Sequence, residues 1–391
     1  MKNPWLLPEG IEEILPPQAG QLEELCRRII DLYKSWGYQL VMPPIIEFLE
    51  SLLTGTGEDL DLQTFKLTDQ LSGRMMGIRA DTTPQVARID AYNLKRDIPS
   101  RLCYLGTVLH TRPENHGNSR SPLQVGAELY GHRGKESDAE ILCLMLETLQ
   151  VAGIRQVHVD LGHVGIYQGI VAQAGLNADQ ESELFDILQR KAGSELQQSV
   201  KTWSLPGKTA AMLEFLIDAN GDASILKKAT KQLASANAGV KRCLKELNEV
   251  TMLVRKQIPD APLNFDLAEL RGYHYHTGIV FAAYVPGSGQ GIAFGGRYDD
   301  IGKAFGRARP ATGFSTDLKT LITLTSSTQT GKKGIFAPSK TDPALLRQIN
   351  RLRQRGETVV FELPGQKGGA KDMGCDRKLV RKNGSWKLVK L

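Results

Sequence analysis

The segment Arg101–Gly131 restricts the possible folds most, because it predicts two strands joined by a long polar loop. Leu102–Leu109 is rich in apolar and β-favouring residues. The polar stretch 113–122 that follows is typical of a loop. The rest of the chain is therefore expected to be organised around two strands that flank a long polar loop.

The second strand is expected over Leu123–Tyr130 and carries polar residues on one face. Gln124, Gly126 and Glu128 are two positions apart, so their side chains point to the same side of a sheet. That side is either exposed to solvent or the wall of a polar pocket. From the pattern alone, an exposed face is the commoner arrangement.

The chain has 391 residues, 41% of them hydrophobic and 24% charged, which suits two or three globular domains. No apolar stretch approaches the ~20 residues of a membrane span, and the N-terminal sequence shows no secretion signal. The five cysteines are scattered, which indicates reduced thiols and argues against disulfides or a zinc site. We therefore expect a cytoplasmic protein.

The net charge of +6 is unevenly distributed. Residues 331–391 contain 15 Lys and Arg and 5 Asp and Glu, a net +10, whereas residues 1–330 contain 34 and 38, a net −4. An acidic main body fits nucleic-acid binding poorly. The basic tail could contact RNA or an acidic protein, although a solvated basic surface is the simplest interpretation.

Helical periodicity is clearest over Gln21–Trp36 and Ser137–Ala152. The stretch from 177 to about 258 is rich in Ala, Lys, Gln and Leu and predicts an all-helical insertion in an otherwise mixed domain. Pro84–Leu94 predicts a helix, and Thr312–Leu324 predicts the start of another.

Proline and glycine mark several strand ends. Tyr38–Phe48 contains Pro43 and Pro44, which lack the N–H of a central ladder, so this strand is expected at an edge or an interface. Gly295 and Gly296 are expected in turns, because they match no phosphate-binding spacing.

Seven polar residues near predicted strand ends or turns are candidates for a ligand pocket. Two carboxylates with an amide oxygen suit a ligand ammonium group, and a guanidinium suits a carboxylate or phosphate, so the set suits an amino acid. For the first of them, capping the helix that follows is an equally good explanation. The candidates are Asp81, Gln124, Glu128, Arg271, Tyr275, His276 and Tyr298.

His274 and His276 alternate with tyrosines, which would place both on one strand face. No third ligand lies nearby in the sequence, so a metal pair is disfavoured. No nucleophile motif has supporting context either. We expect no metal and no cofactor.

Taken together, these segments resemble the catalytic core of class II aminoacyl-tRNA synthetases, specifically histidyl-tRNA synthetase, over about Leu7–Leu324. GYQLVMPPIIEF resembles the first motif, a dimer-interface element with its proline at Pro44. Arg101–Gly131 aligns without gaps to the second motif, and PATGFSTDLKTL corresponds to the third. The resemblance implies an α+β fold: an antiparallel sheet flanked by helices, with a helical insertion and a short α/β C-terminal domain.

The same resemblance implies a histidine pocket. Gln124 and Glu128 fall on positions that bind the α-amino end of the substrate, and LRGYHYHTG places Arg271 on the catalytic arginine. The other pocket positions come from GIRADTTPQVARI, LRGYHYHTG and GGRYDD, and they are Asp81, Thr83, Tyr275, His276 and Tyr298.

Four positions on the nucleotide side depart from the synthetase pattern. His110 stands where an arginine holds the ATP α-phosphate, and Arg112 replaces an acidic residue that faces the nucleotide. In the third motif, Asp317 replaces a glycine and Thr320 replaces the arginine at the γ-phosphate. A positioned donor contributes ~3 kcal/mol to such a step, so losing both arginines should remove adenylation.

These departures, with LGHVGIYQ and GCDRKLV, resemble the synthetase-like regulatory subunits of ATP phosphoribosyltransferase. That family implies a non-catalytic core over residues 1–324 and a short basic domain over 325–391. It implies partnership with a short catalytic subunit in the first step of histidine biosynthesis, within a hetero-octamer. Activation of that subunit and transmission of feedback inhibition by L-histidine are the implied roles.

The resemblance also implies a homodimer through the region near Pro44. We expect no membrane association, and nucleic acid is an unfavoured partner. Two alternatives stay open: a divergent histidyl-tRNA synthetase, and a stand-alone protein that binds an amino acid or RNA.

Overall fold

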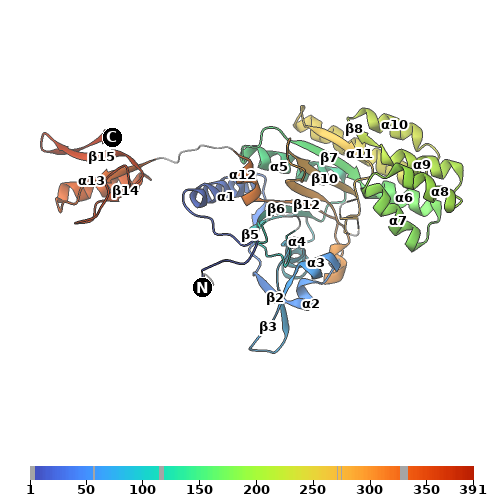
Figure 1. Cartoon of the computed structure of the whole chain (residues 1–391), viewed down its shortest axis with the longest axis horizontal. Coiled ribbons are helices and arrows are strands. Elements are labelled where there is room, and N and C mark those ends of the chain that lie inside the picture. Colours follow the sequence, from blue (N-terminus) through green and yellow to red (C-terminus); the bar gives the residue numbers. More distant parts are fainter. Residues whose placement is uncertain (1–4, 56–57, 114–118, 271, 274, 326–332) are drawn as a thin grey trace. The chain divides into compact units, whose positions relative to one another are not determined.

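The computed structural model describes residues 5–55, 58–113, 119–270, 272–273, 275–325 and 333–391. The chain divides into two compact units, Met1–Ser326 and Ser327–Leu391 (Figure 1).

A nine-stranded sheet forms the centre of the first unit. Neighbouring strands are antiparallel except for two pairs, β1 with β5 and β7 with β9. In spatial order the strands are β1 (Gln39–Leu40), β5 (Ser100–Thr107), β6 (Leu123–Tyr130), β12 (Ala311–Asp317), β11 (Ala293–Arg297), β10 (Ile279–Tyr284), β7 (His158–His163), β9 (Leu263–Asp266) and β8 (Asn220–Gly221).

The strand pair predicted within Arg101–Gly131 is present. β6 has the predicted bounds, and β5 lies about two residues before its predicted range. The predicted strand Tyr38–Phe48 is divided: β1 pairs at the edge of the large sheet, and β2 (Ile46–Phe48) joins a small separate sheet. Pro43 and Pro44 lie between the two strands, as the edge prediction requires.

Helices cover one face of the large sheet (Figure 1). α5 (Lys135–Val151) packs against β6, β11 and β12, and α1 (Gln18–Ser35) packs against α5. On α1 the buried residues recur every three or four positions: Leu22, Leu25, Ile29 and Tyr33. This spacing gives one apolar stripe, which joins the main hydrophobic core.

The opposite face of the sheet holds a second, smaller core. Side chains alternate along β5 and β6, so Cys103 and Ala127 join the main core while Tyr104 and Tyr130 face the smaller one. The elements beside this face are α4 (Thr83–Arg88), the π-helix η1 (Ile89–Leu94) and the 3₁₀-helix η2 (Ile301–Phe305). The ligand-site candidates lie here.

A three-stranded sheet with two short helices lies beside this region. Its strands pair in the order β2, β4 (Met75–Ile78) and β3 (Phe65–Thr68). The short helices are α2 (Leu49–Leu52) and α3 (Glu58–Gln63).

The predicted insertion is helical with one exception. The two-residue strand β8 interrupts the helices and pairs with β9, so the prediction of an all-helical insertion is wrong at this point. The pairing ties the insertion to the edge of the large sheet. The helices are α6 (Val164–Ala174), which precedes the insertion, then α7 (Ala178–Gln189), α8 (Gly193–Thr202), α9 (Gly207–Ile217), α10 (Ser224–Gln232) and α11 (Ala238–Gln257).

Three further predictions need correction. The first half of Thr312–Leu324 is strand β12, and only α12 (Leu318–Leu324) is helical. Gly295 and Gly296 lie inside β11 rather than in a turn. At Gly295 an added Cβ would lie 2.5 Å from the carbonyl oxygen of Gly313, so close strand packing requires this glycine. His276 lies outside any strand, and His274 is outside the described residues.

The second unit is a small α/β domain. Its sheet has the order β14 (Val359–Phe361), β13 (Gly334–Ala337), β15 (Cys375–Lys382) and β16 (Ser385–Lys390). Helix α13 (Pro343–Gln354) packs on one face of this sheet through Leu345, Ile349 and Leu352. The final hairpin turns at Asn383-Gly384, where both residues have a positive φ.

Candidate functional site

Glu128 is the centre of the candidate site. Its carboxylate oxygen Oε1 accepts hydrogen bonds from Thr83 Oγ1 and from the Tyr104 hydroxyl, both at 3.1 Å. The Tyr298 hydroxyl contacts the other oxygen, Oε2. Glu128 is 1% exposed, and no Lys, Arg or His of the described residues forms an ion pair with it. Burial raises the pKa of the Glu128 carboxyl to about 8.

Glycines on the neighbouring strands leave room for this carboxylate. Gly313 on β12 lies directly opposite Glu128 in the strand register. A Cβ at Gly313 would lie 1.5 Å from Glu128 Oε2, which no packing tolerates. On the next strand, Tyr104 lies opposite Gly126, whose missing side chain leaves space for the Tyr104 hydroxyl. Two glycines therefore allow a carboxyl group and a phenol inside the sheet layer.

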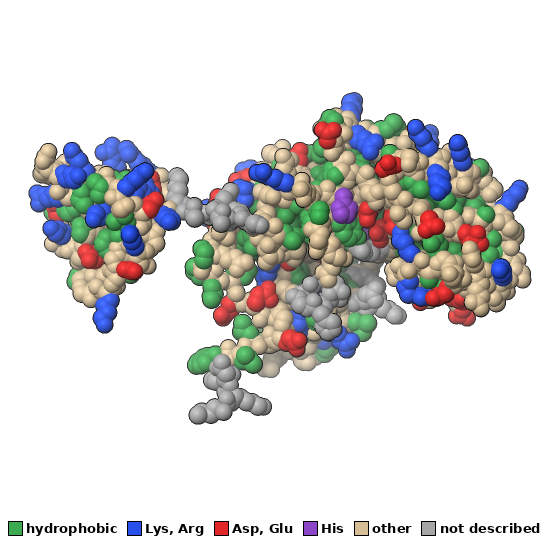
Figure 2. All heavy atoms as spheres, turned by 45° about the horizontal axis from the view of Figure 1, so that its top comes forward, with side chains coloured by type: hydrophobic (Ala, Val, Ile, Leu, Met, Phe, Trp, Pro, Cys, Tyr) green, Lys and Arg blue, Asp and Glu red, His purple; other side chains and the backbone are tan. Residues whose placement is uncertain are grey.

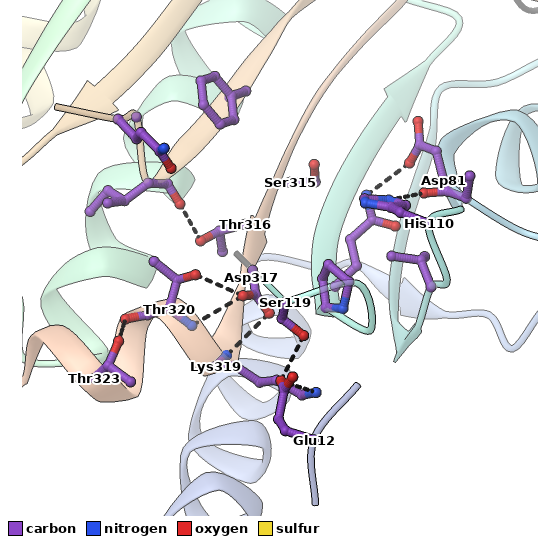
Figure 3. Close-up of a pocket in the computed structure, with 18 of the residues that line it drawn as sticks. Glu12, Asp81, His110, Ser119, Ser315, Thr316, Asp317, Lys319, Thr320 and Thr323 are labelled. Atoms are coloured by element: carbon purple, nitrogen blue, oxygen red, sulfur yellow. Dashed lines mark hydrogen bonds and ion pairs between the residues drawn. The ribbon is translucent and has the colours of Figure 1, made fainter. Parts of the chain in front are cut away.

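Asp81 and Gln124 continue the site toward an open cavity. Gln124 Nε2 donates to Asp81 Oδ1 at 2.8 Å, and Gln124 Oε1 accepts from the Thr82 amide at 3.0 Å. Asp81 Oδ1 also accepts from the Thr83 amide at 3.2 Å, so Asp81 serves both the start of α4 and the pocket wall. The cavity has a volume of about 1060 Å³ (Figure 3).

The aromatic candidates pack beside Glu128 and do not line the cavity. The Tyr275 ring stacks on the Tyr298 ring at 5.0 Å between centroids, and the buried Tyr275 hydroxyl has no hydrogen-bond partner among the described residues. His276 Nδ1 donates to the Arg297 carbonyl oxygen at 3.2 Å. Burial lowers the pKa of His276 to about 4, so its ring is neutral at pH 7. Arg271 lies outside the described residues.

The nucleotide-side positions lie near the cavity but bind other parts of the chain. The buried His110 donates through Nε2 to the Ala80 carbonyl oxygen at 2.9 Å. Asp317 accepts from the backbone amides of Leu123, Lys319 and Thr320 at 2.9–3.2 Å.

Thr320 binds within the same cap, since its hydroxyl donates to Asp317 Oδ2 at 2.7 Å (Figure 3). Arg112 is exposed and does not line the cavity. His110, Asp317 and Thr320 are therefore engaged within the chain, whereas Arg112 lies on the surface away from the cavity.

A segment near the N-terminus adds a residue that sequence reasoning missed. Glu12 Oε1 accepts from Lys319 Nζ at 2.8 Å and from the Ser119 hydroxyl at 2.6 Å (Figure 3). Lys319 Nζ also donates to the Ser121 hydroxyl at 3.0 Å. The lysine on the cavity wall is thus already neutralised by the chain's own carboxylate. No motif surrounds Glu12, so nothing local in the sequence indicates this contact.

Tyr104 is the second missed residue. Its position on the pocket face could have been found by extending the strand alternation from β6 to β5. Among the described residues, no group of three or more His, Cys, Asp or Glu side chains is arranged to hold a metal ion. None of the described helices is long and apolar enough to cross a membrane.

Comparison with known proteins assigns the two units. Residues 10–321 match the family model described as histidyl-tRNA synthetase, and residues 332–389 match that of the ATP phosphoribosyltransferase subunit HisZ C-terminal domain. A protein of Thioalkalivibrio sulfidiphilus is 60% identical over 97% of this chain and 96% of its own, and it is named ATP phosphoribosyltransferase regulatory subunit. The chain belongs to the family of ATP phosphoribosyltransferase regulatory subunits.

Other relatives and solved structures agree with this family. A regulatory subunit of Nitrosococcus oceani is 54% identical over 99% of this chain and 97% of its own. The structure of an ATP phosphoribosyltransferase regulatory subunit/histidyl-tRNA synthetase of Bacillus halodurans has a TM-score of 0.85 and 25% identity, covering 95% of this chain and 96% of that one.

A histidyl-tRNA synthetase of Nostoc shares the fold, with a TM-score of 0.80 at 20% identity over 97% of this chain and 92% of its own. The predicted synthetase-like α+β fold and the predicted regulatory-subunit family are both confirmed.

Proposed function

We propose that this chain joins a short-form ATP phosphoribosyltransferase catalytic subunit, activates it and helps transmit feedback inhibition by L-histidine. The proposal rests on family membership together with one structural observation. Glu128 is a buried carboxylate held by three hydroxyl groups and without a cationic partner among the described residues. The ammonium group of an amino acid supplies the missing positive charge.

The remaining candidate residues extend this proposed histidine site. Asp81 and Gln124 offer carboxylate and amide oxygens at the cavity wall, and Thr83 holds Glu128 in place. Tyr275, His276 and Tyr298 would border the ligand side chain, and Arg271 would bind its carboxylate. No cofactor is required for such a binding role.

We propose further that the chain has no aminoacylation activity of its own. His110 and Thr320 cannot replace two arginines at a triphosphate, and the Asp317 carboxylate would repel it. The relatives' name describes subunits of an enzyme complex, which is consistent with a supporting role. Retention of the Glu128 pocket favours one alternative, a divergent synthetase, and histidine-dependent ATP–pyrophosphate exchange by the pure chain would establish it.

The region near Pro44 is proposed as a homodimer interface. Four large apolar side chains in this short segment are exposed by 40–80%, a cluster that a partner surface would cover. They are Leu40, Met42, Ile45 and Ile46. Sedimentation of the pure chain tests this interface, since Met42→Glu should produce monomers.

The decisive experiment combines the purified chain with a short catalytic subunit and measures phosphoribosyl transfer. We expect higher turnover with the chain than without it, and inhibition by histidine that requires the chain. Equal turnover with and without the chain would contradict the proposal.

The remaining alternative is an RNA-binding protein. Deleting residues 331–391 would then abolish RNA binding, whereas we expect little RNA affinity for the full chain at physiological salt. We propose the cytoplasm as its location, where the catalytic subunit and its substrates would meet it.

A further inference from the structure

The outer face of α13 carries a row of arginines that the C-terminal unit itself does not use. Arg347, Arg351 and Arg355 are four residues apart, so they follow one stripe along the helix and its C-cap. All three are exposed, and the buried residues of α13 occupy the opposite side. We call this stripe the arginine row.

Within residues 333–391, no carboxylate forms an ion pair with the arginine row. Residues 333–391 contain 14 Lys and Arg but only 5 Asp and Glu. Each of those five acids is bound elsewhere: Glu357 and Asp376 to Arg377, Asp342 to Trp386 and the α13 amides, Glu362 to the Ser339 amide, and Asp372 to the Gly369 amide.

The side chains of Arg347, Arg351 and Arg355 form no hydrogen bond or ion pair within residues 333–391. Like charges four residues apart destabilise a helix by about 0.2–0.5 kcal/mol per pair. Favourable interaction with the helix dipole offsets this cost near the last turn, at Arg351 and Arg355, but not at Arg347. The arginine row therefore lowers the stability of the folded unit slightly, and no contact within residues 333–391 offsets this loss.

Figure 2 shows Lys and Arg side chains gathered over this unit. The unit is also the part of the chain that matches the regulatory-subunit model, whereas the synthetase model ends at residue 321. The arginine row therefore lies in the unit that matches the regulatory-subunit model and outside the region that matches the synthetase model.

We propose that the arginine row docks an acidic face of the catalytic subunit, an inference that rests on the function proposed above. A helix rises about 1.5 Å per residue, so the guanidinium groups repeat every ~6 Å. Asp or Glu side chains at four-residue intervals on a partner helix repeat at the same distance. Arginine suits such a surface because it binds carboxylates with two parallel hydrogen bonds.

The chemistry of this face favours a protein over a nucleic acid. Proteins that bind single-stranded nucleic acid stack bases on exposed aromatic rings. The aromatic residues of the described part of this unit are Phe336, Phe361 and Trp386. All three lie on strands and are half-buried, and Trp386 Nε1 donates to Asp342.

The test compares two triple charge reversals in the full chain, each changing the net charge by six units. The first is Arg347→Glu with Arg351→Glu and Arg355→Glu. The matched control is Lys378→Glu with Lys382→Glu and Lys387→Glu. These exposed lysines lie on the sheet face opposite α13. Lys378 and Lys382 point away from the side on which the buried Leu379 packs against α13, and Lys387 pairs with Val380 on the same outer face. Circular dichroism confirms folding of each variant.

Binding to the purified catalytic subunit is measured by surface plasmon resonance at low and physiological salt. We expect the arginine-row variant to bind at least about tenfold more weakly, mainly through slower association, and the lysine control to bind within about twofold of the wild type. Replacing all three arginines with lysine should give an intermediate affinity, because charge is kept but paired hydrogen bonds are lost.

Three results would overturn the inference. Wild-type affinity in the arginine-row variant would exclude docking at this face. Equal weakening by both reversals would indicate a general charge effect. Binding of RNA by the wild type that only the arginine-row variant loses would assign the row to nucleic acid. If the wild type itself binds no catalytic subunit, the proposed function fails, a result distinct from the first three.

Discussion

The inner and outer halves of the candidate site differ in whether their charged groups have partners within the chain. In the inner half, Glu128 is buried with three hydroxyl partners and no counter-charge among the described residues. In the outer half, Lys319 pairs with Glu12, and Asp317 is occupied by backbone amides. A half with an unmatched charge gains from binding a ligand, whereas a half that satisfies itself gains little.

The largest effect is expected from closing the inner half. In Gly313→Ala the new Cβ would lie 1.5 Å from Glu128 Oε2, so the carboxylate or the strand must move. Histidine binding measured by calorimetry should be lost, and overpacking should lower stability by about 1–3 kcal/mol. Gly207→Ala is the control, since nothing lies within 4 Å of its Cβ. Retained histidine affinity in Gly313→Ala would place the ligand elsewhere.

Removing only the charge tests the central assumption. Glu128→Gln keeps the shape of the side chain but cannot balance an ammonium group, so histidine affinity should fall about 100-fold. Glu12→Gln in the outer half should leave that affinity within about twofold. If the two substitutions weaken histidine equally, the proposed difference between the halves is wrong.

The third prediction concerns pH. With a pKa of about 8, Glu128 is mostly protonated at pH 6 and about half ionised at pH 8. An ammonium group binds the ionised form, so affinity should rise about fifty-fold over this range from Glu128 alone. The histidine side chain also titrates there, and Glu128→Gln measures that separate contribution. An identical pH dependence in both proteins would contradict the assignment.

The same shift has a consequence for the unliganded chain. A carboxyl whose pKa is raised on folding favours the folded state fully below its unfolded value, near 4.5, and loses that contribution as the pH rises through about 8. The stability of the wild type, measured by thermal unfolding, should therefore decrease from pH 4.5 to pH 8 relative to that of Glu128→Gln.

In the outer half, Asp317 should contribute to the stability of the chain but not to its affinity for histidine. Asp317→Ala removes the acceptor for the Leu123, Lys319 and Thr320 amides, and the loss of such a cap costs about 1–2 kcal/mol. Thermal unfolding measures this cost, while calorimetry should find histidine affinity unchanged. A large loss of affinity would show that the halves are coupled.

The smallest effect is expected at the Glu12–Lys319 pair. The Glu12 side chain is 42% exposed, so solvent screens the pair, and Glu12→Gln should cost at most about 1 kcal/mol. Glu13→Gln is the matched control, because Glu13 lines the same cavity and forms no ion pair with the described segments. A larger cost in Glu12→Gln would mean that the outer half depends strongly on this contact.

Sequence reasoning located the inner half better than the outer half. Gln124 and Glu128 follow from strand alternation, because their positions depend only on neighbours along the chain. Whether that face is buried depends on Gly313, nearly two hundred positions away, so the pattern alone favoured solvent. Glu12 was missed for the same reason: its partner Lys319 is 307 residues distant.

The error at Thr312–Leu324 has a local cause. Asp317 is both the last residue of β12 and the N-cap of α12, so strand and helix meet without a connecting loop. A helix signal over the second half was extended across the first. The strand's true role depends on pairing with β6 and β11, which no short window reveals.

The pairing of β8 with β9 has a consequence for how the chain opens. Gly221 pairs with Phe265, the Leu267 amide donates to the Ala219 carbonyl oxygen at 3.0 Å, and Lys191 Nζ lies 2.7 Å from Asp266 Oδ2. These contacts connect the insertion to β9, the strand that precedes the segment with Tyr275. The insertion and the sheet edge should therefore unfold as one cooperative unit, with similar hydrogen-exchange protection on both sides of the β8–β9 junction.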